Sequence, residues 1–215
     1  MITVIIGKGS AATTFVVHEP LLTSSSAYFQ RALKSTFKEG DTGQVNLEED
    51  DPQVFGLVNE YLYTGVIAVS RVDTDFLRWF SELWLLAHYL QIPRLVNYAM
   101  WRLVSWAGQD LNDASGMALN IREVEELYDR APMESKLRKF LVDLLIWKEE
   151  NKALEMSDYA PHSMMRDGIR EAKRKASGIV KSPLLNVKNY YTKDEELVQV
   201  EGSMEEATVQ GRRQS

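Results

Sequence analysis

Residues 50–65 read DDPQVFGLVNEYLYTG, and this stretch decides how the fold of the chain is interpreted. An aspartate followed by a proline is typical of a helix start, because the carboxylate of Asp51 can accept hydrogen bonds from free N–H groups and Pro52 needs no donor there. The apolar residues that follow recur at helical spacing, and Gly65 is a common helix stop. We therefore expect a helix from Pro52 to about residue 64.

On the N-terminal side of this helix, the sequence predicts mostly strands. Two β-branched runs at residues 2–6 and 13–17 flank a glycine-containing loop, which is typical of a hairpin. Residues 20–33 show the apolar spacing of a helix that begins at a proline. Residues 44–48 alternate like a half-buried strand after a glycine-rich turn, and residues 66–69 could add one more short strand.

On the C-terminal side, the pattern is entirely helical. Apolar residues recur at helical spacing over residues 76–90, 93–106, 121–130 and 132–149, with Ile92-Pro93 and Ala131-Pro132 as breaks between neighbouring helices. Strands followed by a run of helices indicate the α+β class. We expect an α+β domain with a helical extension.

The composition is that of an ordinary globular protein. The 215 residues correspond to one domain or to one domain with an appendage, since domains usually have about 100–200 residues. Apolar residues make up 45% and charged residues 26%, and the net charge is −6. This acidic balance argues against direct nucleic-acid binding, because proteins that bind phosphate backbones usually present a basic face.

No apolar run reaches the 18 or so residues that cross a bilayer, and the N-terminus lacks the basic region of a secretory signal. We therefore expect no membrane association and an intracellular location, in the cytoplasm, the nucleus or both. After residue 176 the chain has no tryptophan or phenylalanine and is rich in polar residues. Residues 176–215 are predicted to form a disordered tail, with possible local docking at Leu184-Leu185 and Tyr190-Tyr191.

Residue types that could perform catalysis do not combine into a known motif in the sequence. The absence of cysteine excludes thiolate metal sites and cysteine nucleophiles, and His18, His88 and His162 lack metal-binding spacing. Residues 7–10 (GKGS) lack the glycine spacing of a phosphate-binding loop, and the carboxylates of residues 48–51 fit a solvated turn and a helix cap. We predict a non-enzymatic protein without cofactor or bound metal.

Short motifs follow one another along the chain in a characteristic order and spacing. Over residues 2–107 they are Phe15-Val-Val-His18, Leu21-Leu22, Ser24–Ser26, Tyr28-Phe29, Phe37-Lys38-Glu39, Val45-x-Leu47, Asp50-Asp51-Pro52-x-x-Phe55, Tyr61–Gly65 and Leu86-Ala87-x-x-Leu90-x-Ile92. This series resembles the BTB/POZ domain, a small sheet of three to four strands capped by a cluster of helices. Residues 108–175, with Ile121-Arg122, Pro132, Leu137-Arg138 and Leu141–Asp143, look like the helical region that follows this domain in many filamentous-fungal members.

The resemblance implies a non-enzymatic protein–protein interaction module. Some family members self-associate and others bridge substrates to the cullin scaffolds of ubiquitin ligases, so the implied partner is a second copy or a cullin. Phe37-Lys38-Glu39 matches the hydrophobic-x-Glu pattern associated with cullin contact, where Phe37 would fill an apolar pocket and Glu39 would fix the register. The favoured interpretation of these residues alone is structural, with Phe37 closing the core and Glu39 in a solvated turn.

Two further features bear on function. The helix expected over residues 76–90 is apolar around most of its circumference, which favours a buried central position. The alternative is that Trp79 and Trp84 are exposed and form a docking patch. The basic run at residues 170–175 fits a solvated helix end best, but it could also serve as the import signal of a nuclear, transcriptional regulatory assembly protein.

The sequence departs from better-known family members at both ends. If Met1 is the native start, the N-terminal helix that forms domain-swapped dimers is missing, which puts such a dimer in doubt. No Kelch repeat, zinc finger, MATH domain or ankyrin array follows in the given sequence. A role as substrate adaptor for a cullin-based ubiquitin ligase would therefore require the helical extension or the tail to bind the substrate.

Overall fold

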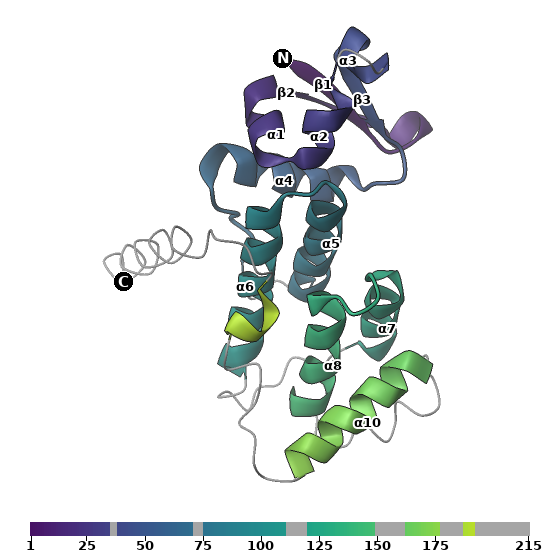
Figure 1. Ribbon diagram of the computed structural model, residues 1–215, viewed down its shortest axis with the longest axis vertical. Helices are drawn as coiled ribbons and strands as arrows, with labels where there is room; N and C mark the ends of the chain where they lie inside the picture. The colour runs from purple at the N-terminus through teal and green to yellow at the C-terminus, as the bar shows by residue number, and fades with distance from the viewer. Residues whose placement is uncertain (35–37, 71–74, 111–119, 149–161, 177–186, 192–215) are drawn as a thin grey trace, which may run out of the picture.

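The computed structural model describes residues 1–34, 38–70, 75–110, 120–148, 162–176 and 187–191. Figure 1 shows these elements stacked along one long axis, with a small sheet at one end and helices below it. α1, α2 and α4 cover the sheet, the pair α5 and α6 stands beneath them, and α7, α8 and α10 lie at the far end. One connected cluster of buried apolar side chains extends from the sheet to α8.

The sheet has three strands in the order β2-β1-β3. β1 (Ile2–Ile6) pairs antiparallel with β2 (Thr13–Val17) and parallel with β3 (Gln44–Leu47). A short 3-10 turn, η1 (Gly9–Ala11), lies between the first two strands. The predicted hairpin and the predicted third strand are thereby confirmed. Alternate side chains of β1 and β3 point into the core, which is why these strands read as period-two patterns.

The helical pattern of residues 20–33 forms two helices, α1 (Glu19–Ser25) and α2 (Ala27–Ala32), so the single predicted helix was wrong. The break falls at Ser26, whose hydroxyl accepts a hydrogen bond from the Phe29 N–H at 3.2 Å and donates one to the Leu90 carbonyl at 2.5 Å. The backbone of Ser26 is extended, with φ of −128° and ψ of 116°, as is usual for a residue that caps a helix N-terminus, and this conformation ends the preceding helix. The predicted glycine-rich turn contains a short helix, α3 (Lys38–Thr42).

The helix expected from Pro52 to about residue 64 is confirmed. α4 runs over Pro52–Thr64, and Asp51 Oδ1 accepts a hydrogen bond from the Gln53 N–H at 2.7 Å. Gly65 ends the helix in the left-handed conformation with φ of 74°, and its N–H donates to the Tyr61 carbonyl. Glycine adopts this conformation without the steric cost that other residues pay.

Residues 66–69, predicted as a possible fourth strand, form no ladder with the described strands. Ile67 N–H donates to the Tyr98 hydroxyl at 2.9 Å. The guanidinium of Arg102 donates to the carbonyls of Ile67 and Val69, both at 2.7 Å. Because side chains of one helix satisfy these backbone groups, the segment needs no strand partner.

α5 (Phe76–Tyr89) and α6 (Pro93–Asp110) form the centre of the molecule. Phe76, Phe80 and Trp84 of α5 are fully or almost fully buried, which confirms the central position predicted for this helix. α6 extends across residue 107, where the sequence predicts a domain boundary. The division of the chain into a domain over 2–107 and an extension over 108–175 stays a prediction.

The extension consists of α7 (Ile121–Arg130), α8 (Lys136–Lys148) and α10 (His162–Ala176). α8 begins four residues later than predicted, because Pro132–Ser135 form a turn in which Ser135 Oγ accepts from the Arg138 N–H. The basic run at 170–175 lies at the end of α10, as the favoured interpretation held.

The prediction of a disordered tail is wrong for residues 187–191. Val187–Tyr190 form a 3-10 helix, η4, that contacts α6 and α8, and Tyr190 is buried. The predicted docking is thereby confirmed for Tyr190, because an aromatic side chain in a polar segment has apolar surface to bury. Leu184, Leu185 and the remainder of the tail lie outside the described residues.

A candidate protein-interaction groove along α5

Of the predicted cullin motif, the structure describes only part. Phe37 lies outside the described residues, and Lys38 is the first residue of α3. Glu39 is half-buried, and its carbonyl accepts a hydrogen bond from the Gly43 N–H at 2.9 Å. Glu39 therefore lies on a short helix at the end of the molecule that carries the sheet, as Figure 1 shows.

The two predicted tryptophans of α5 have different environments. Trp84 is 1% exposed, so the prediction that it forms an exposed docking patch was wrong. Its position on the core face of α5 explains this, since the side chain packs within the apolar cluster and stacks on His88 with centroids 5.0 Å apart. Trp79 is half-buried and lines a groove.

This groove, which we call the α5 groove, has a volume of about 640 Å³ and is formed by three parts of the chain. α5 contributes Trp79, Glu82 and Tyr89, and the turn before α4 contributes Asp50. Arg130, at the end of α7, and the residues after it close the third side. The groove therefore lies where the sheet-bearing part meets the helical extension.

An ion pair joins two walls of the α5 groove. Both terminal nitrogens of Arg130 donate to the carboxylate of Glu82, one of them at 2.7 Å to Oε2. The fork of an arginine matches the two oxygens of a carboxylate, so this geometry fixes the orientation of both side chains. Burial raises the pKa of Asp50, and the nearby charge of Arg130 partly opposes that rise.

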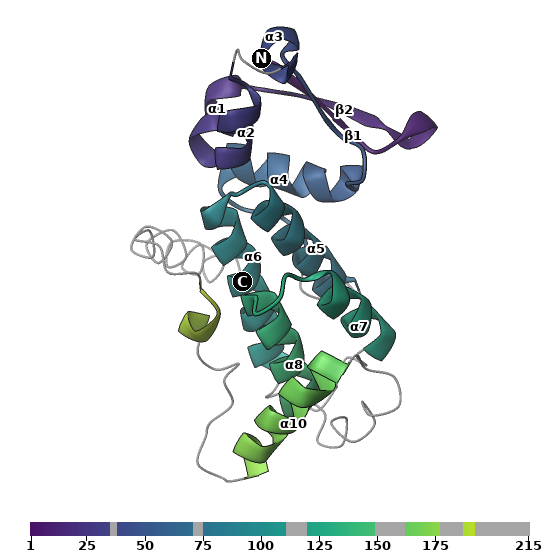
Figure 2. The same cartoon turned by 45° about the vertical axis from the view of Figure 1, so that its right-hand side comes forward.

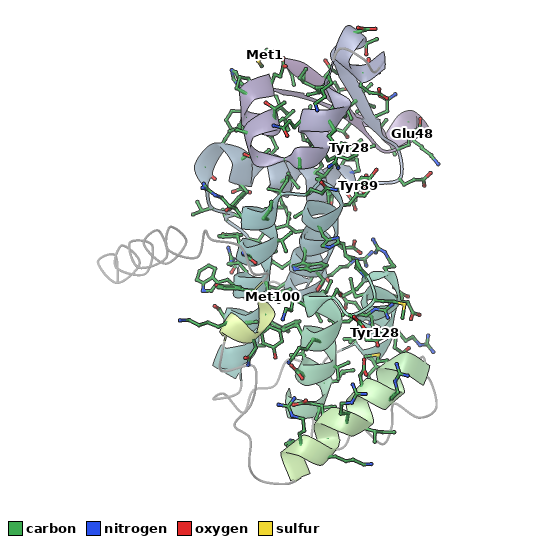
Figure 3. The ribbon with its side chains drawn as sticks, viewed as in Figure 1. Met1, Tyr28, Glu48, Tyr89, Met100 and Tyr128 are labelled. Atoms are coloured by element: carbon green, nitrogen blue, oxygen red, sulfur yellow. The ribbon has the colours of Figure 1, made fainter. Side chains whose placement is uncertain are left out.

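An aromatic pair connects the α5 groove to α2. The rings of Tyr28 and Tyr89 have centroids 5.3 Å apart, and Figure 3 shows the two side chains side by side. Burial, followed by hydrogen bonding with Tyr89, raises the pKa of Tyr28 to about 12, and the charges of Glu39 and Asp50 contribute. The charges of Glu39 on α3 and of Asp50 in the α5 groove therefore act on the same side chain, Tyr28.

The lining of the α5 groove combines aromatic and acidic side chains. Tyr89 is 53% exposed and Trp79 half-buried, so aromatic area is available to a partner. The groove lining includes five carboxylates against two arginines and one histidine: Glu49, Asp50, Asp51, Asp75 and Glu82 against Arg78, Arg130 and His88. A partner with apolar side chains next to basic ones would complement it.

The sequence predictions missed Glu82, Tyr89 and Arg130. Trp79, Glu82 and Tyr89 are spaced three and seven residues apart, which places them along one face of a helix. This spacing could therefore have predicted a polar and aromatic stripe along one face of an otherwise apolar helix. Arg130 carried no such signal, because its approach to α5 depends on how α7 folds back.

Two further properties of the described residues bear on other functions. In the ranges described, no three histidine or carboxylate side chains group in a way that could hold a metal ion. Among the described helices, none combines the length and the apolar character needed to cross a bilayer.

The residues and fold described above match a known domain family. Residues 2–101 match the model of the BTB/POZ domain. The three-stranded sheet with its helices agrees with that α+β fold, so this part of the chain is a BTB/POZ domain.

Three related proteins are similar to parts of the chain. Kelch-like protein 40 of Xenopus tropicalis is 28% identical and Kelch-like protein 40b of Danio rerio 31% identical, each over 81 residues, or 38% of this chain and 12% of the relative. Kelch repeat protein M-T9 of Myxoma virus (strain Lausanne) is 30% identical over 146 residues, or 68% of this chain and 26% of the relative. The chain thus spans only a small part of each relative's length.

The similarity to the viral protein is too long to fit within the matched domain, so it must include residues after 101. Among solved structures, the BTB domain of zebrafish PATZ1 is similar with 24% identity and a TM-score of 0.35, covering 46% of this chain and 71% of that one. The resemblance of residues 108–175 to filamentous-fungal members stays a prediction.

Proposed function

We propose that this chain is a non-enzymatic protein–protein interaction module whose partner surface runs from α3 along the α5 groove. The observation that carries the proposal is the contact of Tyr28 with Tyr89, which lines the α5 groove together with Trp79. The charge of the predicted motif residue Glu39 also acts on Tyr28. The BTB/POZ domain over residues 2–101 supports a role in protein interaction.

We further propose that the partner of this surface is a cullin scaffold. The hydrophobic-x-Glu motif at Phe37–Glu39 supports this choice, and so does the similarity to Kelch-like proteins within the domain. A helix with an apolar stripe flanked by basic residues would place its apolar side chains on Trp79 and Tyr89. Its cations would then face the carboxylates of the groove.

The test is calorimetric titration of the full chain with a cullin N-terminal domain. We expect micromolar or tighter binding, and a loss of at least about tenfold for both Glu39→Arg and Trp79→Ala. Asp167→Arg on α10 is the control, because it makes the same charge reversal at the opposite end of the molecule.

Three outcomes decide between the proposals. Binding that Asp167→Arg weakens as much as Glu39→Arg would mean that net charge, and not this surface, determines the affinity. If the cullin domain does not bind and light scattering shows a dimer, self-association is the activity and the cullin proposal is abandoned. Equal loss of stability and binding in Glu39→Arg would assign Glu39 to the core.

A nuclear regulatory role is a second proposal, and the structure gives it less support. Of the four cations in the run 170–175, Arg170 and Arg174 pair with Asp167 and Glu171 on the same helix. Lys175 donates to the Ile146 carbonyl at 3.3 Å. An import receptor would have to replace these contacts. Unchanged localisation of the Lys173→Ala, Arg174→Ala double variant in cells would exclude the proposal.

A further inference from the structure

The segment η4 (Val187–Tyr190) packs between α6 and α8, although it lies far from both in the sequence. Figures 1 and 2 show it as a short yellow-green turn beside α6. Lys188 is exposed and Asn189 half-buried, while Tyr190 is 1% exposed. Among residues 188–191, whose side chains the structure describes, Tyr190 is the most deeply buried.

Residues of α8 contact both the ring and the hydroxyl of Tyr190. The ring packs edge-on against Phe140 with centroids 5.8 Å apart, and Lys139 Nζ lies 4.7 Å from the ring centre. The hydroxyl donates to Asp143 Oδ2 at 2.5 Å. Lys136 Nζ donates to the Asn189 carbonyl at 3.3 Å. We call this environment on α6 and α8 the tyrosine slot.

Asp143 is the polar centre of the tyrosine slot. It is 2% exposed and accepts from Lys139 Nζ at 2.5 Å as well as from Tyr190. Burial raises the pKa of Asp143, while Lys139 and Tyr190 oppose the rise. A buried carboxylate needs such donors, so the slot has a strong requirement for the hydroxyl of its occupant.

We propose that the tyrosine slot is a binding site for a tyrosine-bearing peptide segment, filled here by the chain's own residues 187–191, and that it rejects the phosphorylated form of that tyrosine. The proposal stands independently of the α5 groove. A short segment anchored by a deeply buried aromatic side chain resembles a bound peptide, because a few buried side chains supply most of the binding energy at interfaces.

The rejection of phosphate follows from charge. A phosphate on the Tyr190 hydroxyl would bring a charge of about −1.5 to −2 to the carboxylate of Asp143 and remove the proton that it accepts. Glu171 on α10 is 5% exposed and adds a second negative charge close enough to influence both Asp143 and Tyr190. Lys139 and Arg174 already pair with these two carboxylates. Phosphorylation would therefore release the segment.

The first experiment measures binding of a fluorescent peptide of residues 184–194 to the full chain by anisotropy. In the Tyr190→Ala chain the slot is empty, so the peptide should bind at least about tenfold more tightly than to the unsubstituted chain. Peptides with phosphotyrosine or phenylalanine at position 190 should bind at least about tenfold more weakly to that variant. A peptide with phenylalanine at position 191 is the matched control. Its affinity for the Tyr190→Ala chain should fall less than that of the peptide with phenylalanine at position 190.

Each other result overturns the proposal. Equal binding to the two chains, or none to a folded Tyr190→Ala chain, would show that the slot takes no separate ligand. Binding of the phosphopeptide as tight as that of the unmodified one would contradict the rejection of phosphate.

The second experiment does not depend on how well Tyr190→Ala folds. Tyr190→Phe in the full chain keeps the ring and removes only the hydroxyl, so amide hydrogen exchange of residues 187–191 should become at least about tenfold faster while α5 is unchanged. Unchanged exchange would show that Asp143 does not select the hydroxyl.

Discussion

The two faces of α5 carry the same types of residue and perform different tasks. One face buries Phe80 and Trp84 in the core, and the other presents Trp79 and Tyr89 to the α5 groove. Trp79 and Trp84 are five positions apart, which on a helix corresponds to a rotation of about 140°. Tryptophan content alone therefore does not identify an exposed surface. The rotation of each residue about the helix axis decides its role.

Of the substitutions that test the difference between the two faces of α5, Trp84→Ala should lower the free energy of unfolding most. Truncation of a fully buried aromatic side chain removes its packing and leaves a cavity, which typically costs about 3–5 kcal/mol. Urea unfolding followed by circular dichroism measures this loss. A cost below about 1 kcal/mol would mean that the core face of α5 is not where the structure places it.

Arg102→Met should have the next largest effect. Arg102 is 7% exposed, and its loss leaves the carbonyls of Ile67 and Val69 without their described donor, so we expect a cost of about 2–4 kcal/mol. The substitution also removes the contact of the guanidinium carbon with the Phe80 ring, whose centroid lies 4.5 Å away. Arg122→Met on the exposed side of α7 is the control for loss of a charge and should change stability by less than about 0.5 kcal/mol.

Trp79→Ala should separate stability from binding. Because Trp79 is only half-buried, we expect Trp79→Ala to lower the free energy of unfolding by about 1–2 kcal/mol, less than Trp84→Ala does. Its effect on cullin binding should be larger than its effect on unfolding when both are expressed as free energies. If Trp79→Ala and Trp84→Ala lowered the free energy of unfolding equally, the two faces of α5 would not differ in burial as described.

Arg130→Ala should have the smallest effect on stability and a clear effect on one pKa. The Arg130 side chain is 57% exposed, so loss of its pair with Glu82 should cost no more than about 1 kcal/mol. The pKa of Asp50, already raised by burial, should rise further because Arg130 lowers it. Titration of the Asp50 carboxyl by NMR measures this change, and an unchanged or lower pKa would contradict the geometry of the groove.

The pH dependence that follows has a definite sign. Asp50 holds its proton more tightly in the folded than in the unfolded state, so its ionisation destabilises the fold. That destabilisation is fully present above the folded-state pKa and disappears as the pH falls below the unfolded-state pKa. It should be larger in Arg130→Ala than in the unsubstituted chain.

Local chemistry made much of the fold predictable. Asp51-Pro52 and Gly65 mark the two ends of α4 because a cap and a left-handed residue act within one turn of the chain. The break at Ser26 was not predictable, because the Leu90 carbonyl that its hydroxyl meets is 64 residues away. The absence of a strand at residues 66–69 was unpredictable for the same reason. Arg102, more than 30 residues later in the chain, donates the hydrogen bonds that the carbonyls of Ile67 and Val69 accept.

The candidate site was predictable only in part. Trp79 was identified as a candidate, but so was the buried Trp84, because the helix is apolar on most sides and gave no clear face. Arg130 joins the groove through an ion pair to Glu82 across 48 residues, and no local pattern encodes such a contact. Tyr190 was recognised as an aromatic side chain in a polar tail, whereas its partner Asp143 was not.

The strand order β2-β1-β3 has a consequence for the folding kinetics of the chain. Pairing β1 with β2 closes the loop of residues 7–12, whereas pairing β1 with β3 closes residues 7–43. The longer closure costs about 1.5 kcal/mol more in chain entropy, so the hairpin should form before the parallel pair. In stopped-flow refolding we expect a higher φ-value for Val17→Ala than for Val45→Ala. The reverse order would mean that the helices between β2 and β3 form first and bring the distant strands together.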